Sequence, residues 1–321
     1  MARCCTPTAP VASWHRRSGL GSSRSSRQPR RPALRRIGFI GVGAIGARMA
    51  WRLVGAGFDL HVHDVAAAAR EAFAGRARLA ASPASCAGED VVIFMVANDA
   101  QLTEAVLGNG GLISGIDADK PPMVAVMSTV LPRTIKQLAG PLADKGVRFV
   151  DAPVSGGPAG ADAGTLSIMV GGRSDDLETL RPLFEAMGDR IFHCGELSSG
   201  ELIKILNNMI GVTNLFLTAE VMALARGHGM EPERLLDIMD VSSGRSAYTR
   251  NWSDRRAVYG AIAADPMRLE RHVAICRKDL DFSLALAGQI GLDLPLFAHL
   301  TDTIGELPKE DLRRLWRQAF E

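Results

Sequence analysis

A lysine and two asparagines interrupt the apolar segment GELIKILNNMIG, which spans residues 200–211 of the 321-residue chain. Its other side chains are mostly apolar, as expected for a helix with a buried face. Lys204 and Asn208 are four residues apart, so they share one face of that helix. A poorly hydrated lysine has a lowered pKa and can exchange protons with a substrate. Alternatively, its stem packs while its ammonium group reaches water. Periodicity alone leaves both interpretations open.

A glycine pattern, GVGAIG at residues 41–46, is the second candidate for chemistry. It follows a strand predicted at residues 37–40 and precedes an alanine-rich helix, and a second predicted strand, residues 60–63, ends at an aspartate. This order is typical of a dinucleotide-binding unit, in which the glycines let the backbone approach the pyrophosphate at a helix N-terminus. Its alternative is a glycine-rich turn without a ligand. The predicted cofactor contacts are Gly41, Gly43, Ala44, Ile45, Gly46 and Asp64.

The position of Asp64 favours one cofactor over another. It lies 18 residues after Gly46, where a carboxylate can accept hydrogen bonds from the adenosine ribose. The same charge repels the 2′-phosphate of NADP, and residues 65–67 contain no arginine. We therefore expect NAD as the cofactor, with NADP as the less favoured alternative.

Further apolar runs of strand length, residues 90–96, 123–129, 147–153 and 166–172, predict a parallel sheet covered on both faces. Ligands of such doubly wound sheets bind at the carboxyl ends of the strands. Ser155 and the amides of Gly156 and Gly157 follow one such end and form a neutral donor set that can hold a carboxylate. A hairpin-like Gly/Pro loop is the alternative there. The other candidates at strand ends are Ala97, Asn98 and Thr129.

From residue 198 onward the pattern is helical. Ser198 and Glu201 have the spacing of a capping box, and a long apolar helix is predicted from about residue 199 to 228. The predicted fold class is α/β: a Rossmann-type doubly wound parallel sheet, then an all-helical C-terminal domain joined by this long helix. The expected parts are a basic leader (1–35), an NAD(P)-binding domain (36–197) and a helical domain (198–321) for substrate binding and dimerisation. Such a long apolar helix favours a homodimer or homotetramer.

Charge and composition exclude several classes of protein. Residues 1–36 contain nine of the 37 basic residues and no acid, so the remaining 28 face 35 acidic residues. A net charge of −7 on the folded part argues against a nucleic-acid partner. From the sequence, we expect no apolar stretch that approaches the ~18 residues of a membrane span. The five cysteines form no C-x-x-C pair, His61 and His63 lack a third ligand, and no metal site is expected.

The arginine- and serine-rich leader bears on localisation. Its composition is typical of a disordered tail or an over-extended start, and also of an organelle transit peptide. We expect a cytoplasmic protein, with organelle import as the less favoured alternative.

Four segments taken in order resemble the β-hydroxyacid dehydrogenases, the group around 3-hydroxyisobutyrate dehydrogenase. They are GFIGVGAIGARMA, DAPVSGGPAGADAGTLSIMVGG, GELIKILNN and RKDLDFSLALA, and the likeness covers about residues 36–300. It implies that Lys204 is the general acid/base and that Asn208 orients a small carboxylate substrate. It also implies that Ser155, Gly156 and Gly157 bind the substrate carboxylate, and that Thr129 and Lys278 contact the nicotinamide side of the cofactor.

One departure from the family pattern concerns the substrate. Where many members have Leu-Pro, this chain has Ala97-Asn98, which is similar to the branch acting on sugar acids such as threonate. Asn98 either donates to extra substrate hydroxyls or simply ends the strand. Arg245 is a candidate for binding a distal anionic group of the substrate, or it is a surface loop residue.

We expect oxidation of a 3-hydroxyisobutyrate-like acid to its semialdehyde, or the reverse, with a threonate-type dehydrogenase as the alternative. Imine reductases and non-catalytic NAD-binding relatives are disfavoured because both groups generally lose the lysine.

Overall fold

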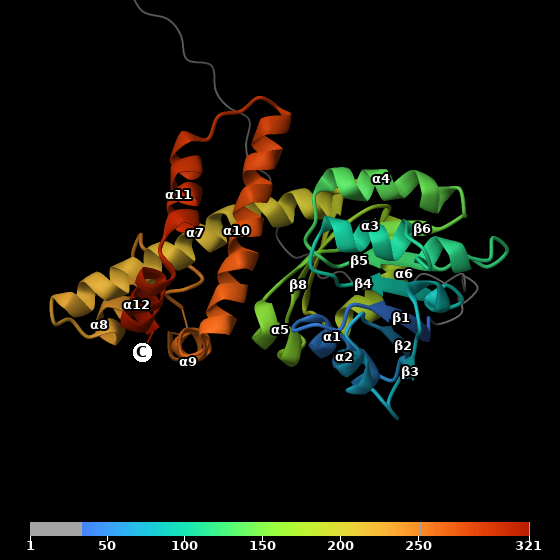
Figure 1. Cartoon of the computed structure of the whole chain (residues 1–321), viewed down its shortest axis with the longest axis horizontal. Coiled ribbons are helices and arrows are strands. Elements are labelled where there is room, and N and C mark those ends of the chain that lie inside the picture. Colours follow the sequence, from blue (N-terminus) through green and yellow to red (C-terminus); the bar gives the residue numbers. More distant parts are fainter. Residues whose placement is uncertain (1–33, 251, 321) are drawn as a thin grey trace, which may run out of the picture. The chain divides into compact units, whose positions relative to one another are not determined.

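The computed structural model describes residues 34–250 and 252–320 (Figure 1). Residues 34–321 form one compact unit, so the division at residues 197 and 198 stays a prediction. The predicted leader lies outside the described residues except at its end. There the Arg35 amide donates a hydrogen bond of 3.1 Å to Asp90 Oδ2. The described fold therefore begins slightly before residue 36.

One sheet runs through the α/β part in the order β3-β2-β1-β4-β5-β6-β8-β7, with β9 beside β8. The first six strands pair in parallel, in the order predicted for a Rossmann-type sheet. The strands are β1 (Arg36–Ile40), β2 (Asp59–His63), β3 (Arg78–Leu79), β4 (Val91–Phe94), β5 (Met123–Val126), β6 (Arg148–Asp151), β7 (Val154–Ser155), β8 (Ser167–Gly171) and β9 (Arg190–Gly195).

The predicted parallel sheet has one exception at β8, which is antiparallel to both β6 and β7. Between β6 and β8 the chain first forms β7, then reverses through the short helix α5 (Gly157–Ala163), so that β8 returns antiparallel to β7 with Val154 opposite Ile168 and Ser155 opposite Ser167. Three strands were also missed. β3 and β7 contain two residues each, and β9 is a largely exposed edge strand without a continuous apolar run.

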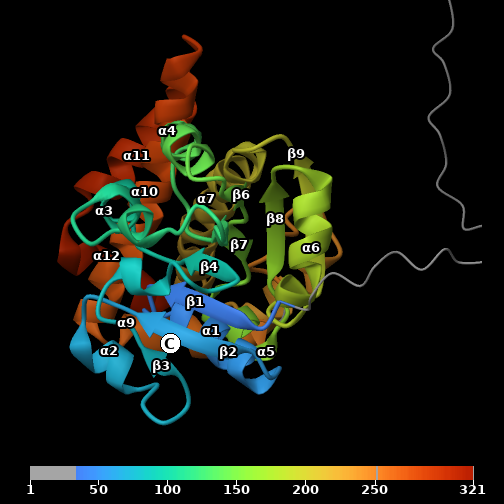
Figure 2. The same cartoon turned by 90° about the vertical axis from the view of Figure 1, so that its right-hand side faces the viewer.

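Alternate residues of the central strands pack on opposite faces of the sheet. Phe39 and Ile93 belong to a core cluster that includes Met49 of α1, while Ile40 and Phe94 belong to a second cluster with α3 and α4. Helices therefore cover both faces, as predicted from the near-continuous apolarity of the strands (Figure 2). The helices of this part are α1 (Gly46–Gly55), α2 (Ala67–Glu71), α3 (Asp99–Leu107), α4 (Pro132–Ala143), α5 (Gly157–Ala163) and α6 (Ser174–Glu185), with 3₁₀ turns η1 (Pro83–Cys86) and η2 (Leu112–Gly115).

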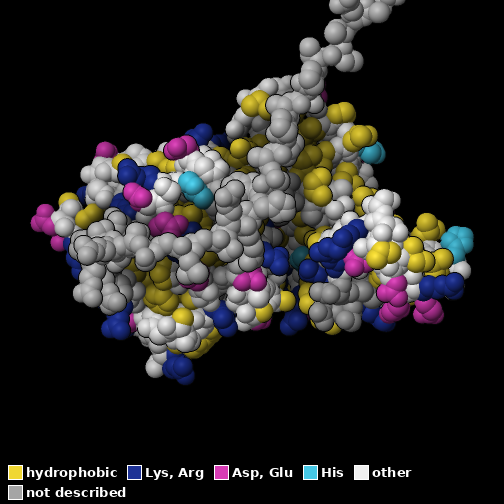
Figure 3. Space-filling model, turned by 180° about the vertical axis from the view of Figure 1, so that it is seen from behind, with side chains coloured by type: hydrophobic (Ala, Val, Ile, Leu, Met, Phe, Trp, Pro, Cys, Tyr) yellow, Lys and Arg dark blue, Asp and Glu magenta, His cyan; other side chains and the backbone are white. Residues whose placement is uncertain are grey.

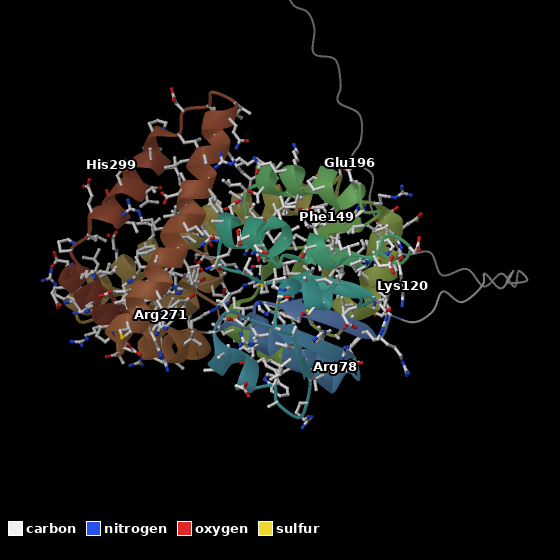
Figure 4. The ribbon with its side chains drawn as sticks, turned by 45° about the vertical axis from the view of Figure 1, so that its right-hand side comes forward. Arg78, Lys120, Phe149, Glu196, Arg271 and His299 are labelled. Atoms are coloured by element: carbon white, nitrogen blue, oxygen red, sulfur yellow. The ribbon has the colours of Figure 1, made fainter. Side chains whose placement is uncertain are left out.

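The amino ends of the strands are tied by a buried carboxylate, Glu89. Arg78, labelled in Figure 4, donates two hydrogen bonds of 3.0 and 3.1 Å to it. His61 Nδ1 lies 3.1 Å from the same group, and His63 Nδ1 lies 3.0 Å from the Ala80 carbonyl oxygen. These two histidines are therefore engaged as ordinary strand residues. Within the described ranges, no group of three or more His, Cys, Asp or Glu side chains is placed to hold a metal ion.

The rest of the described chain is helical, as predicted: α7 (Ser199–Gly227), α8 (Pro232–Asp240), α9 (Trp252–Ala263), α10 (Pro266–Gln289), α11 (Pro295–Glu306) and α12 (Lys309–Phe320). α7 agrees with its predicted bounds to within a residue or so. Its residues Leu215 and Phe216 pack in a third core cluster with Trp316 of α12.

By length and composition α7 is also apolar enough to cross a membrane, so the expectation that no stretch approaches that length was wrong. The core helix of a soluble protein can have the same length and composition. Two ionisable side chains, Glu201 and Lys204, are buried in the first turns of α7 against the rest of the described fold.

Candidate functional site

The turn between β1 and α1 has the geometry of a phosphate-binding loop. Gly41 has a φ of 95°, and a Cβ there would collide with the Met95 carbonyl oxygen. A Cβ on Gly46 would collide with the carbonyl oxygen of Gly41, so helix and turn approach closely. Gly43 instead is exposed and faces open space. Ile45, the N-cap residue of α1, provides no side-chain cap, so no side chain competes with a phosphate at this helix end, although the Ala47 amide donates a hydrogen bond of 2.9 Å to the Gly43 carbonyl oxygen.

Asp64 is placed directly beside this loop. Its Oδ2 accepts a hydrogen bond of 2.8 Å from the Val42 amide, and its Oδ1 accepts one of 2.9 Å from the Ala66 amide. Each oxygen keeps further acceptor capacity for ribose hydroxyls. Arg70 donates to the backbone carbonyl of Asp64. The residues directly after Asp64 do not reveal this arginine, because only the helical turn of α2 brings residue 70 back to Asp64.

At the carboxyl end of β5, the predicted cofactor residue Thr129 contacts Lys278, the predicted cofactor residue on α10. Lys278 Nζ donates a hydrogen bond of 3.0 Å to the carbonyl oxygen of Thr129. Ser128, also at this end, accepts a hydrogen bond of 2.7 Å from the Val96 amide and so fixes one loop against the other. Ala97 is exposed next to this point.

Asn98 has a local structural task. Its side-chain oxygen accepts a hydrogen bond of 2.9 Å from the Gln101 amide and thereby caps α3. Two interpretations of Asn98 were open, and this hydrogen bond gives a physical cause for the one in which Asn98 ends the strand: the residue also starts the next helix.

The segment predicted to hold a carboxylate follows β6 and β7. Ser155 is the last residue of β7 and is half-buried, and Gly156 precedes the first turn of α5, where Gly157 lies. No hydrogen bond of the Ser155 hydroxyl is formed within the described part of the chain. The hydroxyl thus keeps its donor for a ligand.

Lys204 is buried, with a relative exposure of 7%. This burial leaves only a small part of the side chain accessible, which favours the interpretation of a poorly hydrated amine over that of an ammonium group extended into water. Burial is the largest influence on the pKa of Lys204 and lowers it, whereas the charges of Asp279 and Glu201 act in the opposite direction. Its Nζ forms no hydrogen bond or ion pair with the described residues. The amine is therefore available to a substrate.

Asn208 lies one turn further along α7 and is held by α10. Its Nδ2 donates a hydrogen bond of 2.8 Å to Asp279 Oδ2. Asp279 Oδ1 in turn lies 3.3 Å from Lys278 Nζ, which also lies 4.9 Å from the Phe282 ring centroid. Asn208 and Lys278 thus share Asp279 as a partner, and the charge of Asp279 also acts on Lys204. Asp279, which the resemblance places with Lys278 in the cofactor-contacting segment RKDLDFSLALA, is thus the residue that links α10 to Asn208.

The start of α7 differs from the predicted capping box. Ser198 makes no side-chain cap, and among the described residues it is the one non-glycine with a positive φ, 80°. The carboxylate of Asp151, at the end of β6, accepts hydrogen bonds of 2.6 Å from the Ser198 amide and 2.8 Å from the Glu201 amide. Because Asp151 takes these donors, Glu201 turns away and accepts a hydrogen bond of 3.2 Å from the Val130 amide.

Arg245 is not brought to Lys204 by any contact within the described residues. It lies on the exposed segment between α8 and α9, with its Nε 3.5 Å from Asp240 Oδ1 and its side chain 52% exposed. Its role toward a substrate stays a prediction.

Two family models match this chain, and they meet at the start of α7. One is described as the NAD binding domain of 6-phosphogluconate dehydrogenase and matches residues 36–195. The other is described as "NAD-binding of NADP-dependent 3-hydroxyisobutyrate dehydrogenase" and matches residues 198–314.

Relatives with assigned activities support the same conclusion. The chain is 40% identical over 213 residues to an NAD-dependent L-serine dehydrogenase of Pseudomonas aeruginosa, covering 66% of this chain and 71% of that protein. It is 35% identical over 265 residues to a 3-hydroxyisobutyrate dehydrogenase of the same organism, covering 82% and 88%. A solved structure of Mycobacterium tuberculosis 3-hydroxyisobutyrate dehydrogenase with L-serine has a TM-score of 0.71 and 26% identity, covering 88% and 99%. The chain therefore belongs to the β-hydroxyacid dehydrogenase family, as an NAD(P)-dependent oxidoreductase that acts on CH–OH groups.

Proposed function

We propose that this protein oxidises a small 3-hydroxy acid, similar to 3-hydroxyisobutyrate, to its semialdehyde with NAD, or catalyses the reverse reduction. The observation that carries the proposal is the buried, unpaired amine of Lys204 beside Asn208 and Lys278. Such an amine is suited to exchange a proton with a substrate hydroxyl.

The proposed mechanism divides the work between cofactor and chain. Nicotinamide chemistry supplies the acceptor for the hydride that leaves the substrate carbon. Lys204 takes the proton of the same C–OH group, so no negative charge is left on the oxygen as the carbonyl forms. Asn208, held by Asp279, orients the hydroxyl. In the reverse direction Lys204 returns the proton to the oxygen.

The substrate carboxylate is proposed to lie on Ser155 and the amides of Gly156 and Gly157. Neutral donors there would hold the acid without forming an ion pair. L-Serine is a second candidate substrate because it is also a β-hydroxy acid and because a relative at 40% identity is named for that activity. Threonate stays an alternative, although capping of α3 by Asn98 gives the Ala97-Asn98 pair a structural cause.

NAD is proposed as the preferred cofactor. The glycine loop fits a dinucleotide, since Gly43 leaves open space and the start of α1 has no side-chain cap. Gly41, Gly43, Ala44, Ile45 and Gly46 would hold the pyrophosphate. Asp64 would accept from the ribose and repel a 2′-phosphate.

We also propose a homodimer or homotetramer located in the cytoplasm. A row of exposed apolar side chains on α7 supports self-association: Ile203, Leu206, Ile210, Leu217, Val221 and Leu224. Most of them recur at spacings of three or four residues, so they lie along one side of the helix. In the view of Figure 3, hydrophobic side chains are visible across the helical part.

A substrate screen tests the proposed function. The purified protein is assayed with 3-hydroxyisobutyrate, L-serine, threonate, glycerate, 4-hydroxybutyrate and 3-hydroxypropionate, each with NAD and with NADP, by the absorbance of the reduced cofactor. We expect the highest kcat/KM for 3-hydroxyisobutyrate or L-serine with NAD. A preference for threonate would support the sugar-acid alternative, and the absence of turnover with every acid would contradict the proposed substrate class.

A further inference from the structure

Glu201 is a fully buried acid, 0% exposed, which lies one helical turn before Lys204 on α7 and has no part in the proposed mechanism. Its Oε2 accepts the 3.2 Å hydrogen bond from the Val130 amide. Its Oε1 is buried and has no hydrogen-bond partner within the described structure. Because an unpaired buried oxygen is costly, especially on a charged group, this arrangement needs a physical explanation.

Asp151 explains why the start of α7 does not stabilise a charge on Glu201. The amino end of a helix normally favours a carboxylate through its free amides and its dipole. Here the amides of Ser198 and Glu201 already donate to Asp151. Asp151 therefore receives the stabilisation that the helix end offers to an anion, and it places a second buried carboxyl group next to Glu201.

The groups that face Glu201 come from several elements. Asp151 approaches from β6, Lys204 from α7 and Lys278 from α10, and Asp279 of α10 acts on Lys204. Burial, followed by the charge of Asp151, raises the pKa of Glu201 well above its ordinary value, and the Val130 amide and the two lysines only oppose this. A neutral carboxyl group satisfies the Val130 amide without adding a second buried anion.

The hydrogen bond to Val130 links two parts of the candidate site. Val130 directly follows Thr129, whose carbonyl oxygen accepts from Lys278 Nζ. Glu201 therefore fastens the segment that carries Thr129 to the helix turn that precedes Lys204.

We propose that Glu201 is a positioning residue that works as a neutral carboxylic acid, joining the Thr129 segment to the first turn of α7 so that Lys204 and the nicotinamide side of the cofactor stay aligned. The inference rests on the proposed function for its effect on turnover. The link itself and the protonation of Glu201 do not depend on that function.

The experiment compares Glu201→Gln and Glu201→Ala with wild type. Glutamine keeps an oxygen that accepts from Val130 and carries no charge, whereas alanine removes the link. Glu196→Gln is the matched control, because Glu196 is exposed and lies five residues earlier, outside the helix (Figure 4).

We expect kcat of the Glu201→Gln variant within about threefold of wild type and an unshifted pH profile of kcat/KM. In the Glu201→Ala variant we expect kcat to fall at least ~10-fold, because the reacting groups lose alignment. The change in KM should be smaller than this change in kcat.

Two readouts remain valid if the protein turns over none of the acids. Hydrogen exchange at the Val130 amide should accelerate in the Ala variant and stay slow in the Gln variant. Unfolding by urea tests the protonation: a group whose folded pKa is raised stabilises the protein at low pH and loses this contribution as the pH rises. Stability of the Gln variant relative to wild type should therefore increase from about pH 5 to pH 8.

Specific results would overturn the inference. Unchanged Val130 exchange in the Ala variant would remove the link. A pH-independent stability difference between the Gln variant and wild type, or a shift of the kcat/KM profile in that variant, would mean that Glu201 is ionised. The wild-type protein could turn over none of the acids while the Val130 exchange and the urea unfolding still behave as expected. That outcome would contradict the proposed function and leave the Glu201 assignment standing.

Discussion

Lys204 has to be neutral to take a proton from a substrate hydroxyl, and its burial favours that form. The lowered pKa of Lys204 should therefore appear in the acid limb of the oxidation reaction, where kcat/KM falls as the pH decreases and the amine becomes protonated. We expect this limb to lie below the ordinary lysine pKa of about 10.4. Initial rates measured between about pH 6 and pH 11 locate it. A limb at or above the ordinary value would contradict the expected effect of burial.

Replacing this lysine tests its chemistry separately from its charge. Lys204→Ala should lower kcat by at least ~100-fold, the lower end of general acid/base effects, while NADH binding measured by fluorescence stays close to wild type. Lys204→Arg is the charge control: arginine does not deprotonate in proteins, so it should be equally inactive in oxidation. Near-normal turnover in either variant would exclude Lys204 as the proton acceptor.

Asp64 should decide between the two cofactors. Asp64→Asn removes the charge that repels a 2′-phosphate while retaining one oxygen for the Val42 or Ala66 amide. We expect the ratio of kcat/KM for NAD to that for NADP to decrease by roughly tenfold, because like-charge contacts cost on the order of a kcal/mol or more. Steady-state kinetics with both cofactors measures this ratio. Arg70→Ala is a useful companion variant, since Arg70 contacts the Asp64 backbone and is the nearby cation that could receive a phosphate.

Residue-level prediction from the sequence succeeded where spacing within one helix or turn sets the geometry. Lys204 and Asn208 share a face because they are four residues apart, and the glycine loop takes its form from local sterics. The partners of α7 could not be predicted in this way. Asp151 lies 50 residues before Glu201, and only the folded sheet brings its carboxylate to the helix start, which is why the capping-box prediction was wrong.

At the scale of elements, the sequence predicted α7 and six of the strands, β1, β2, β4, β5, β6 and β8, because their apolar residues form runs or regular patterns. It did not predict the antiparallel direction of β8, the two-residue strands or the exposed edge strand β9, since these depend on neighbouring strands rather than on periodicity. The packing of α9, α10 and α12 around Trp316 was equally invisible in the sequence. There His272 lies with its ring centroid 5.4 Å from that of Trp316 and 5.7 Å from that of Tyr259.

This packing has a consequence for acid stability. Burial lowers the pKa of His272 to about 4 from an ordinary value of 6.5. Below pH 6.5 the unfolded chain binds a proton that the folded chain does not, so stability is lost as the pH falls from 6.5 towards 4. The full loss amounts to roughly 3 kcal/mol. Urea unfolding of His272→Gln and wild type across this range should show a shallower decrease for the variant.

The control for this prediction is His299→Gln, because His299 is exposed on α11 (Figure 4). Its variant should follow the wild-type curve. Parallel curves for wild type and the His272 variant would mean that His272 is protonated in the folded protein.

At the scale of the whole molecule, the apolar row on α7 gives the chain a surface that a second copy can cover. Stable interfaces bury about 1,600 Å² in total, so a 29-residue helix and its neighbours offer enough surface for one.

Leu217→Glu combined with Leu224→Glu places charges on this row away from Lys204, at positions that are exposed in the single chain. We expect light scattering after size exclusion to give a multiple of the 34.3 kDa chain mass for wild type and a mass close to 34.3 kDa for the double variant. Val65→Glu, an exposed apolar position on the α/β part, should leave the wild-type mass unchanged. A monomeric wild type would contradict self-association through α7, and recovery of the protein only in detergent would instead point to a lipid surface as the partner of this row.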